Sequence, residues 1–145
     1  MSHTYTSTLF HVVFSTKERR SAIAKPEKLW AYLAGVARNL GYEALAIGGT
    51  QNHVHVLCRL SGDVSVSQAV QKLKSNSSRW LRENGPWIGW QEGYGAFSVS
   101  ASNADAVRRY IQNQADHHRR RSFEEELAVL LAKSGIAFDR TEIFG

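Results

Sequence analysis

Two histidines stand two positions apart in the segment His53-Val54-His55, inside an apolar run that is typical of a β-strand. Because side chains alternate between the two faces of a strand, both imidazoles project from one face and Cys58 projects from the other. Two neighbouring imidazoles form half of a metal site. Ordinary hydrogen-bonded histidines fit the same spacing, so this motif alone leaves both interpretations open.

A tyrosine and a glutamine form a second candidate pair in the segment Tyr110-Ile111-Gln112-Asn113-Gln114. On a helix, residues four apart lie on the same face, so the two polar side chains are neighbours. A phenol becomes a nucleophile when a metal or nearby cations stabilise its anion, and it is then also a competent leaving group. An amphipathic helix with a half-buried tyrosine also explains this spacing.

The elements that must position these side chains follow from hydrophobic periodicity and turn residues. The sequence predicts strands over 5–14, 42–47, 53–60 and 96–100, and helices over 26–40, 65–83, 104–117 and 122–133. The order of the first six elements is that of a ferredoxin-like, RRM-like α+β fold (βαββαβ), an antiparallel sheet with two helices on one face. Its other face is left for a site, a partner subunit or the C-terminal helices.

Composition limits the chain to one basic domain. We expect a single domain over 1–145, with a core over about 5–118 and a helical extension over about 119–145. The formal charge of +5 favours polyanionic partners, and the single cysteine excludes a disulfide scaffold. No apolar run is long enough to cross a membrane and no leader precedes the first strand, so we expect a cytoplasmic protein.

Taken together and in this order, the motifs resemble the single-tyrosine HUH transposases of the IS200/IS605 family and the related REP-associated tyrosine transposases. The resemblance is carried by His53-Val54-His55, the basic turn after the first strand, the aromatic segment 90–98, and Tyr110 to Gln114 followed by His117-His118. It implies a bacterial or archaeal homodimer that acts at the nucleoid, recognises hairpin ends, and cuts and rejoins single-stranded DNA through a 5′-phosphotyrosine.

The resemblance also implies roles for individual residues. Tyr110 is expected to be the nucleophile, and His53, His55 and Gln114 are expected to hold a divalent metal, Mg²⁺ or Mn²⁺. These neutral ligands would leave the full charge of the metal available to a scissile phosphate. Groups expected around the ligands are Asn52, His117 and His118. Many relatives have Asp where this chain has Asn52, which predicts weaker orientation of the neighbouring imidazole.

Several cations are candidate phosphate contacts, although solvated surface charge explains each of them as well. They are Lys17, Arg19, Arg20, Lys72, Lys74, Arg79, Arg82, Arg108, Arg109 and the run Arg119-Arg120-Arg121. The aromatic residues Trp87, Trp90 and Tyr94 fit either base stacking or core packing.

Two other functions fit the same sequence. A domesticated nuclease that acts on repeated extragenic palindromes would share the chemistry without self-mobility. A non-catalytic RRM-like module is suggested by Gly93-Tyr94-Gly95-Ala96-Phe97, which resembles an RNP1 motif, but this motif belongs on the third strand and here it enters the fourth. The sequence leaves open whether the active site forms within one chain or between two, and what the C-terminal extension does.

Overall fold

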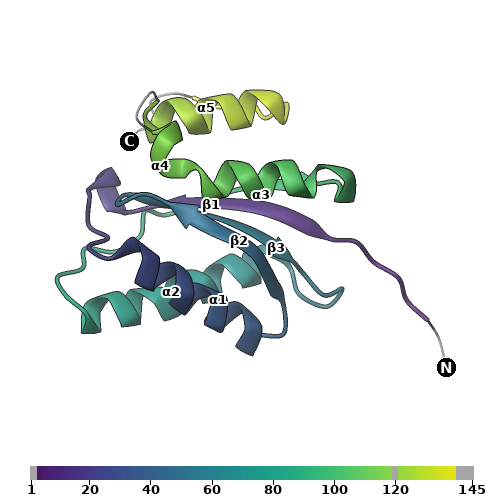
Figure 1. Ribbon diagram of the computed structural model, residues 1–145, viewed down its shortest axis with the longest axis horizontal. Coiled ribbons are helices and arrows are strands. Elements are labelled where there is room, and N and C mark those ends of the chain that lie inside the picture. Colours follow the sequence, from purple (N-terminus) through teal and green to yellow (C-terminus); the bar gives the residue numbers. More distant parts are fainter. Residues whose placement is uncertain (1–2, 119–120, 140–145) are drawn as a thin grey trace.

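A four-stranded antiparallel sheet forms the centre of the computed structural model, which describes residues 3–118 and 121–139 (Figure 1). The strands are β1 (Leu9–Ser15), β2 (Glu43–Gly49), β3 (His53–Arg59) and β4 (Gly95–Val99), in the spatial order β2-β3-β1-β4. This order and the βαββαβ succession confirm the predicted ferredoxin-like α+β fold. The first strand begins at Leu9, later than the predicted residue 5. Before it, the carbonyl oxygen of Thr8 still accepts a backbone hydrogen bond from Leu60 at 3.0 Å.

One face of the sheet is covered by α1 (Pro26–Asn39) and α2 (Val66–Glu83). Proline begins α1, where its missing N–H costs no hydrogen bond, and Ser65 caps α2 in a capping box with Gln68. The main hydrophobic core lies between these helices and the sheet. Its strand residues alternate in sequence as a buried face requires: Val12, Phe14, Val54, Val56 and Cys58.

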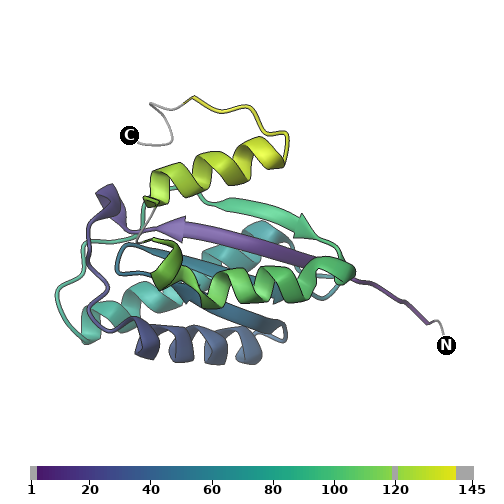
Figure 2. The same cartoon turned by 45° about the horizontal axis from the view of Figure 1, so that its top comes forward.

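The opposite face carries α3 (Ala104–Gln112), α4 (Gln114–His117) and α5 (Phe123–Lys133), as Figure 2 shows. Ile111 of α3 packs against Ala46 and Leu57, on β2 and β3. Phe123 of α5 packs against Val13 and Phe97, on β1 and β4. Helices α3 and α5 therefore cover different halves of this face. The histidines of β3 contact both, because His53 packs against Phe123 of α5 and His55 against Tyr110 of α3.

The predicted helix over 104–117 is interrupted. Asn113 has non-helical dihedral angles (φ −101°, ψ 24°) and separates α3 from the single turn of α4. Asparagine favours such a break because its side chain competes with the helical backbone for hydrogen bonds. The break changes the direction of the chain directly before Gln114.

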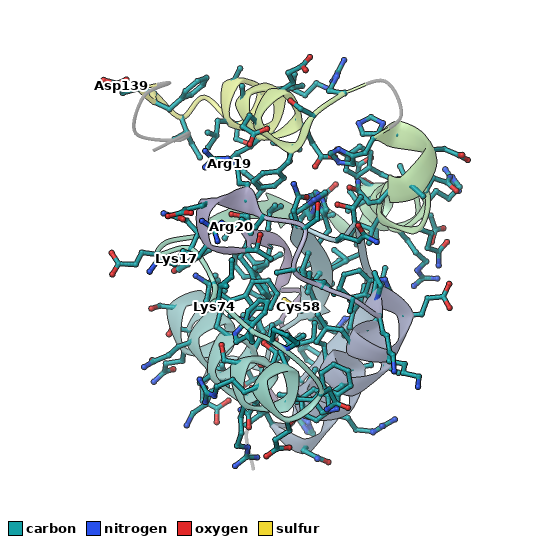
Figure 3. All side chains as sticks on the ribbon, turned by 90° about the vertical axis from the view of Figure 1, so that its left-hand side faces the viewer. Lys17, Arg19, Arg20, Cys58, Lys74 and Asp139 are labelled. Carbon is teal, nitrogen blue, oxygen red and sulfur yellow. The ribbon has the colours of Figure 1, made fainter. Side chains whose placement is uncertain are left out.

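The aromatic segment after α2 is packed into the protein. The indole N–H of Trp90 donates to Ser77 Oγ at 3.0 Å, and its ring meets Phe14 edge-on. Lys74, labelled in Figure 3, donates from Nζ to the carbonyl oxygens of Gln91 (2.8 Å) and Gly93 (2.6 Å). Core packing therefore accounts for Trp90, whereas Tyr94 is 43% exposed. Among the described residues, no helix has the length and apolar character needed to span a membrane.

Candidate metal and tyrosine site

The two histidines of β3 project from the sheet face that α3 and α5 cover, as their alternation predicts. Both side chains are fully buried. Their neighbours Val54 and Val56 point into the core on the other side of the sheet. Strand periodicity thus places both imidazoles in one enclosed space beneath the C-terminal helices.

The ring of His53 is oriented by the loop that precedes it. Its Nδ1 lies 2.8 Å from Asn52 Oδ1 and 3.0 Å from Thr50 Oγ1. Asn52 donates from Nδ2 to the carbonyl oxygen of Arg19, which identifies the amide oxygen as the atom that faces His53. Nδ1 then donates its proton to this oxygen, which turns Nε2 of the ring toward the site. Asn52 therefore supplies the acceptor that orients this imidazole.

A third histidine, for which the sequence predicted no role, orients His55. His11 on β1 is buried, and its Nε2 lies 2.7 Å from His55 Nδ1. Burial lowers the pKa of His11 to about 3 and that of His55 to about 4, so both rings are neutral at pH 7. A neutral His11 can accept the Nδ1 proton of His55, which leaves the Nε2 lone pair of His55 for a metal.

Gln114 and Tyr110 reach the same space from the helices above. Gln114 Oε1 lies 2.9 Å from His53 Nε2, while its Nε2 donates to Glu126 Oε2 at 3.0 Å. The Tyr110 ring centroid lies 5.8 Å from that of His55, and its hydroxyl donates to Glu126. One chain therefore brings together all four of the residues expected to be ligands or nucleophile.

Glu126 on α5 belongs to the same cluster, and sequence reasoning missed it. Its side chain is 1% exposed, and Oε1 lies 2.8 Å from His55 Nε2 and 3.1 Å from His118 Nε2. As the third glutamate of an acidic run, Glu126 resembled ordinary surface charge. Its helical spacing was the available signal, because position 126 falls three residues after Phe123 and so shares the apolar face of the helix.

The two histidines after α3 differ in how far they enter the site. His118 belongs to a group with His53, His55 and Glu126 whose possible ligand atoms lie within 4.8 Å of one another. His117 lies at the edge, with Nε2 3.7 Å from Glu126 Oε2 and its ring centroid 4.9 Å from that of Tyr110.

The donor set fits a divalent metal. His53 Nε2 faces two oxygen atoms, Gln114 Oε1 at 2.9 Å and Glu126 Oε1 at 3.4 Å. A proton on Nε2, or a divalent cation in its place, holds these atoms together. Imidazole nitrogens with amide and carboxylate oxygens are ligands that Mn²⁺ and other divalent metals accept.

Burial and hydrogen bonds shift the pKa values of two acidic groups in the site. Burial disfavours the ionised form of Glu126, but hydrogen bonds with His118, His53 and His55 outweigh this effect and hold the pKa of the carboxyl below its usual range. Burial, followed by the hydrogen bond to Glu126, raises the pKa of Tyr110. The phenol is therefore neutral in this state, and its ionisation requires added positive charge.

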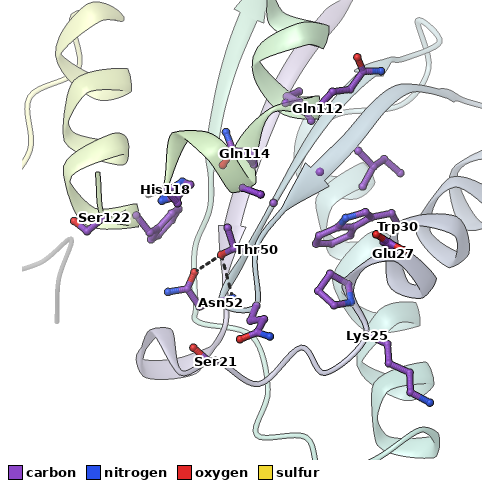
Figure 4. Close-up of a pocket in the computed structure, with 18 of the residues that line it drawn as sticks. Ser21, Lys25, Glu27, Trp30, Thr50, Asn52, Gln112, Gln114, His118 and Ser122 are labelled. Atoms are coloured by element: carbon purple, nitrogen blue, oxygen red, sulfur yellow. Dashed lines mark hydrogen bonds between the residues drawn. The ribbon is translucent and has the colours of Figure 1, made fainter. Parts of the chain in front are cut away.

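A pocket of about 1060 Å³ opens beside the site, at the edge of the sheet that β2 forms (Figure 4). Gln114 and His118 line its inner end, and Lys25 and Trp30 of the α1 region line the outer part. The pocket gives solvent and ligands a route toward the otherwise buried ligand set.

The predicted phosphate contacts are spread over the molecule. Lys17, Arg19 and Arg20 lie together in the turn after β1 (Figure 3), where Arg19 pairs with Glu124 and Arg20 with Glu18. The exposed cations of α2 lie on the opposite face of the sheet from the site: Lys72, Arg79 and Arg82. On α3, Arg109 is exposed and Arg108 is half-buried. Arg119 and Arg120 lie outside the described residues, and Arg121 lines the pocket.

Comparisons with known proteins give the family and the fold of the chain. A family model described as "Transposase IS200 like" matches residues 4–114. A crystal structure from Deinococcus radiodurans R1, assigned as a transposase, has a TM-score of 0.62 at 24% identity, covering 79% of this chain and 96% of that one. A REP-associated tyrosine transposase bound to a REP hairpin has a TM-score of 0.60 at 18% identity, covering 81% and 74% respectively. The search of curated proteins finds no match.

Proposed function

The chain belongs to the family of IS200-like transposases, and from this premise we propose that it cuts and rejoins single-stranded DNA with Tyr110 as nucleophile. The observation that carries the proposal is the position of the Tyr110 hydroxyl, which shares the carboxylate of Glu126 with the buried histidine pair. A nucleophile and a metal-binding set thus meet in one site of one chain.

We assign the metal ligands His53, His55 and Gln114, and Mg²⁺ or Mn²⁺ as the ion. When bound, the ion supplies positive charge that polarises a scissile phosphate and stabilises the tyrosinate. The protein contributes the orientation: Asn52 holds the ring of His53, and the amide of Gln114 presents its oxygen toward the same point. Such outer hydrogen bonds fix the ligand atoms before the ion arrives.

In the proposed reaction, the Tyr110 oxygen attacks the phosphorus of a DNA phosphodiester and loses its proton. The bond from phosphorus to the 3′ oxygen breaks, and that oxygen takes up a proton to leave as a free 3′-OH. A 5′-phosphotyrosine remains, which conserves the energy of the broken bond. Attack by a second DNA 3′-OH then reverses the chemistry and rejoins the strands.

The DNA substrate is proposed to be a single strand beside a hairpin. The pocket next to Gln114 and His118 supports entry of an extended strand from the β2 edge, because Lys25, Trp30 and Arg121 line it. The neighbour that is bound to a REP hairpin supports recognition of folded ends. An enzyme with this substrate would act on chromosomal DNA in the cytoplasm, as a mobile or a domesticated nuclease.

A homodimer remains part of the proposal, because two DNA ends must be held for rejoining. Cleavage itself needs only one chain, since Tyr110 and His55 already meet within it. The RRM-like alternative loses support, because α3 and α5 cover the sheet face on which such a module would stack RNA.

The test is formation of a covalent protein–DNA adduct. The full chain is incubated with Mn²⁺ and single-stranded oligonucleotides from the flanks of its gene, and adducts are resolved under denaturing conditions. We expect an adduct with the wild type and none with Tyr110→Phe, while Tyr94→Phe, which changes an exposed tyrosine, retains it. An adduct that persists in Tyr110→Phe would exclude this nucleophile.

A further inference from the structure

The carboxylate of Glu126 divides its two oxygens between the histidines and the tyrosine. Oε1 lies 2.8 Å from His55 Nε2 and 3.4 Å from His53 Nε2. Oε2 accepts hydrogen bonds from the Tyr110 hydroxyl and from Gln114 Nε2. Among the described residues, Glu126 is thus the one side chain that touches every member of the proposed catalytic set.

The helix that carries Glu126 is anchored on both sides of the carboxylate. Phe123 packs with Val13 and Phe97, and partly buried leucines extend this contact along α5. Ser122 and Glu125 form a capping box at the first turn, and Glu124 pairs with Arg19. These contacts hold α5 against β1 and β4, so the position of the carboxylate is built into the fold.

A glutamate buried to this degree is costly unless charged or polar partners surround it. The partners here are the Nε2 atoms of three histidines, which lie 2.8 Å (His55), 3.1 Å (His118) and 3.4 Å (His53) from Glu126 Oε1. These nitrogens and Oε1 belong to a group of possible ligand atoms that lie within 4.8 Å of one another, so they surround a point at which a divalent cation can bind. The carboxylate therefore has the placement of a metal ligand.

We propose that Glu126 is a catalytic residue with two roles, binding the same divalent metal as His53 and His55 through Oε1 and positioning the Tyr110 hydroxyl through Oε2. The second role rests on the proposed function, whereas the first does not. The C-terminal extension is then part of the active site, and it completes the site within a single chain.

A different role would have the opposite consequence. A carboxylate between a metal site and a nucleophile also occupies the space that a scissile phosphate needs, so α5 could serve as a cover that DNA displaces. Removing the carboxylate would then leave metal binding intact and increase cleavage. The two roles are separated by measuring metal affinity and cleavage in the same variants.

The first measurement is calorimetric titration of the full-length protein with Mn²⁺ in the absence of DNA. The test variant is Glu126→Gln, and the matched control is Glu125→Gln, because glutamine also serves in a capping box. We expect Glu126→Gln to weaken Mn²⁺ binding about 10- to 100-fold and Glu125→Gln to change it little. Equal affinity of Glu126→Gln and wild type would overturn the metal-binding role.

The second measurement is adduct formation at Mn²⁺ concentrations that saturate each variant. We expect Glu126→Gln to form the adduct more slowly even when saturated with Mn²⁺, which means a lower kcat. The reason is that a carboxylate no longer positions the hydroxyl of Tyr110. Faster adduct formation by Glu126→Gln would overturn the proposal in favour of a cover. If the wild type forms no adduct, the proposed function fails and the positioning role fails with it, while the calorimetry still decides metal binding.

A third variant guards against misfolding. Glu126→Ala leaves a small polar cavity, and formate can enter it to replace the missing carboxylate. We expect formate to restore Mn²⁺ affinity to Glu126→Ala, and to have no effect on the wild type. Restoration identifies a local loss of the ligand, whereas a folded Glu126→Ala that binds Mn²⁺ as tightly as wild type without formate would contradict the proposal.

Discussion

The Nε2 atom of His11 lies 2.7 Å from the Nδ1 atom of His55, so one buried histidine orients another from the neighbouring strand. His11→Phe keeps an aromatic ring in this space but removes the acceptor, which frees the ring of His55 to rotate. We expect a loss of about tenfold or more in Mn²⁺ affinity. Calorimetry checks this, with His3→Phe, an exposed histidine, as control. Unchanged affinity would show that packing alone holds His55.

Lys72 and Lys74 differ in role although both were candidate phosphate contacts. The ammonium of Lys74 bonds two carbonyl oxygens of the aromatic segment, whereas Lys72 is exposed on the same helix. We expect Lys74→Met to lower the free energy of unfolding by roughly 1–2 kcal/mol and Lys72→Met to leave it nearly unchanged. Denaturant unfolding measures both variants. Equal free energies of unfolding for Lys74→Met and Lys72→Met would mean that water replaces the ammonium of Lys74 with little loss of stability.

Cys58 should be chemically inert in the folded protein. Its thiol is fully buried, and burial raises its pKa to about 12, so the thiolate that reacts with alkylating agents is scarce at pH 8. We expect no labelling by iodoacetamide under native conditions and full labelling after denaturation. Mass spectrometry of the intact chain reports both states. Rapid native labelling would require the core between α1, α2 and the sheet to open.

Acid should destabilise the metal-free protein over a defined range of pH. His11 and His55 have pKa values of about 3 and about 4 in the folded chain, against 6.5 when unperturbed. As the pH falls below 6.5, the unfolded chain takes up protons that the folded chain does not. The free energy of unfolding therefore falls between about pH 6.5 and pH 4, where His55 begins to protonate in the folded state as well.

Thermal melts in the presence of a chelator measure this dependence. The variant His11→Phe removes one of the two groups, so its stability should fall less steeply over the same range. A wild-type melting temperature that does not change between pH 6.5 and pH 4 would contradict the burial of neutral imidazoles at this site.

Much of the site could be predicted from local spacing. A strand has a period of two residues, which is enough to place His53 and His55 on one face. A helix brings residues four apart together, which is enough to associate Tyr110 with Gln114, even though the helix is broken at Asn113. The order of strands and helices likewise follows from hydrophobic periodicity and turn residues, because these patterns act over a few residues.

The sequence by itself therefore determined the fold, the histidine pair and the tyrosine helix. Only the tertiary structure decided that His11 orients His55, which depends on the register between β1 and β3, and that Glu126 joins them from α5. These contacts join residues 44 and 71 positions apart. Periodicity within one element carries no information about such distances; the packing of α5 against the sheet brings the carboxylate to the metal and tyrosine site.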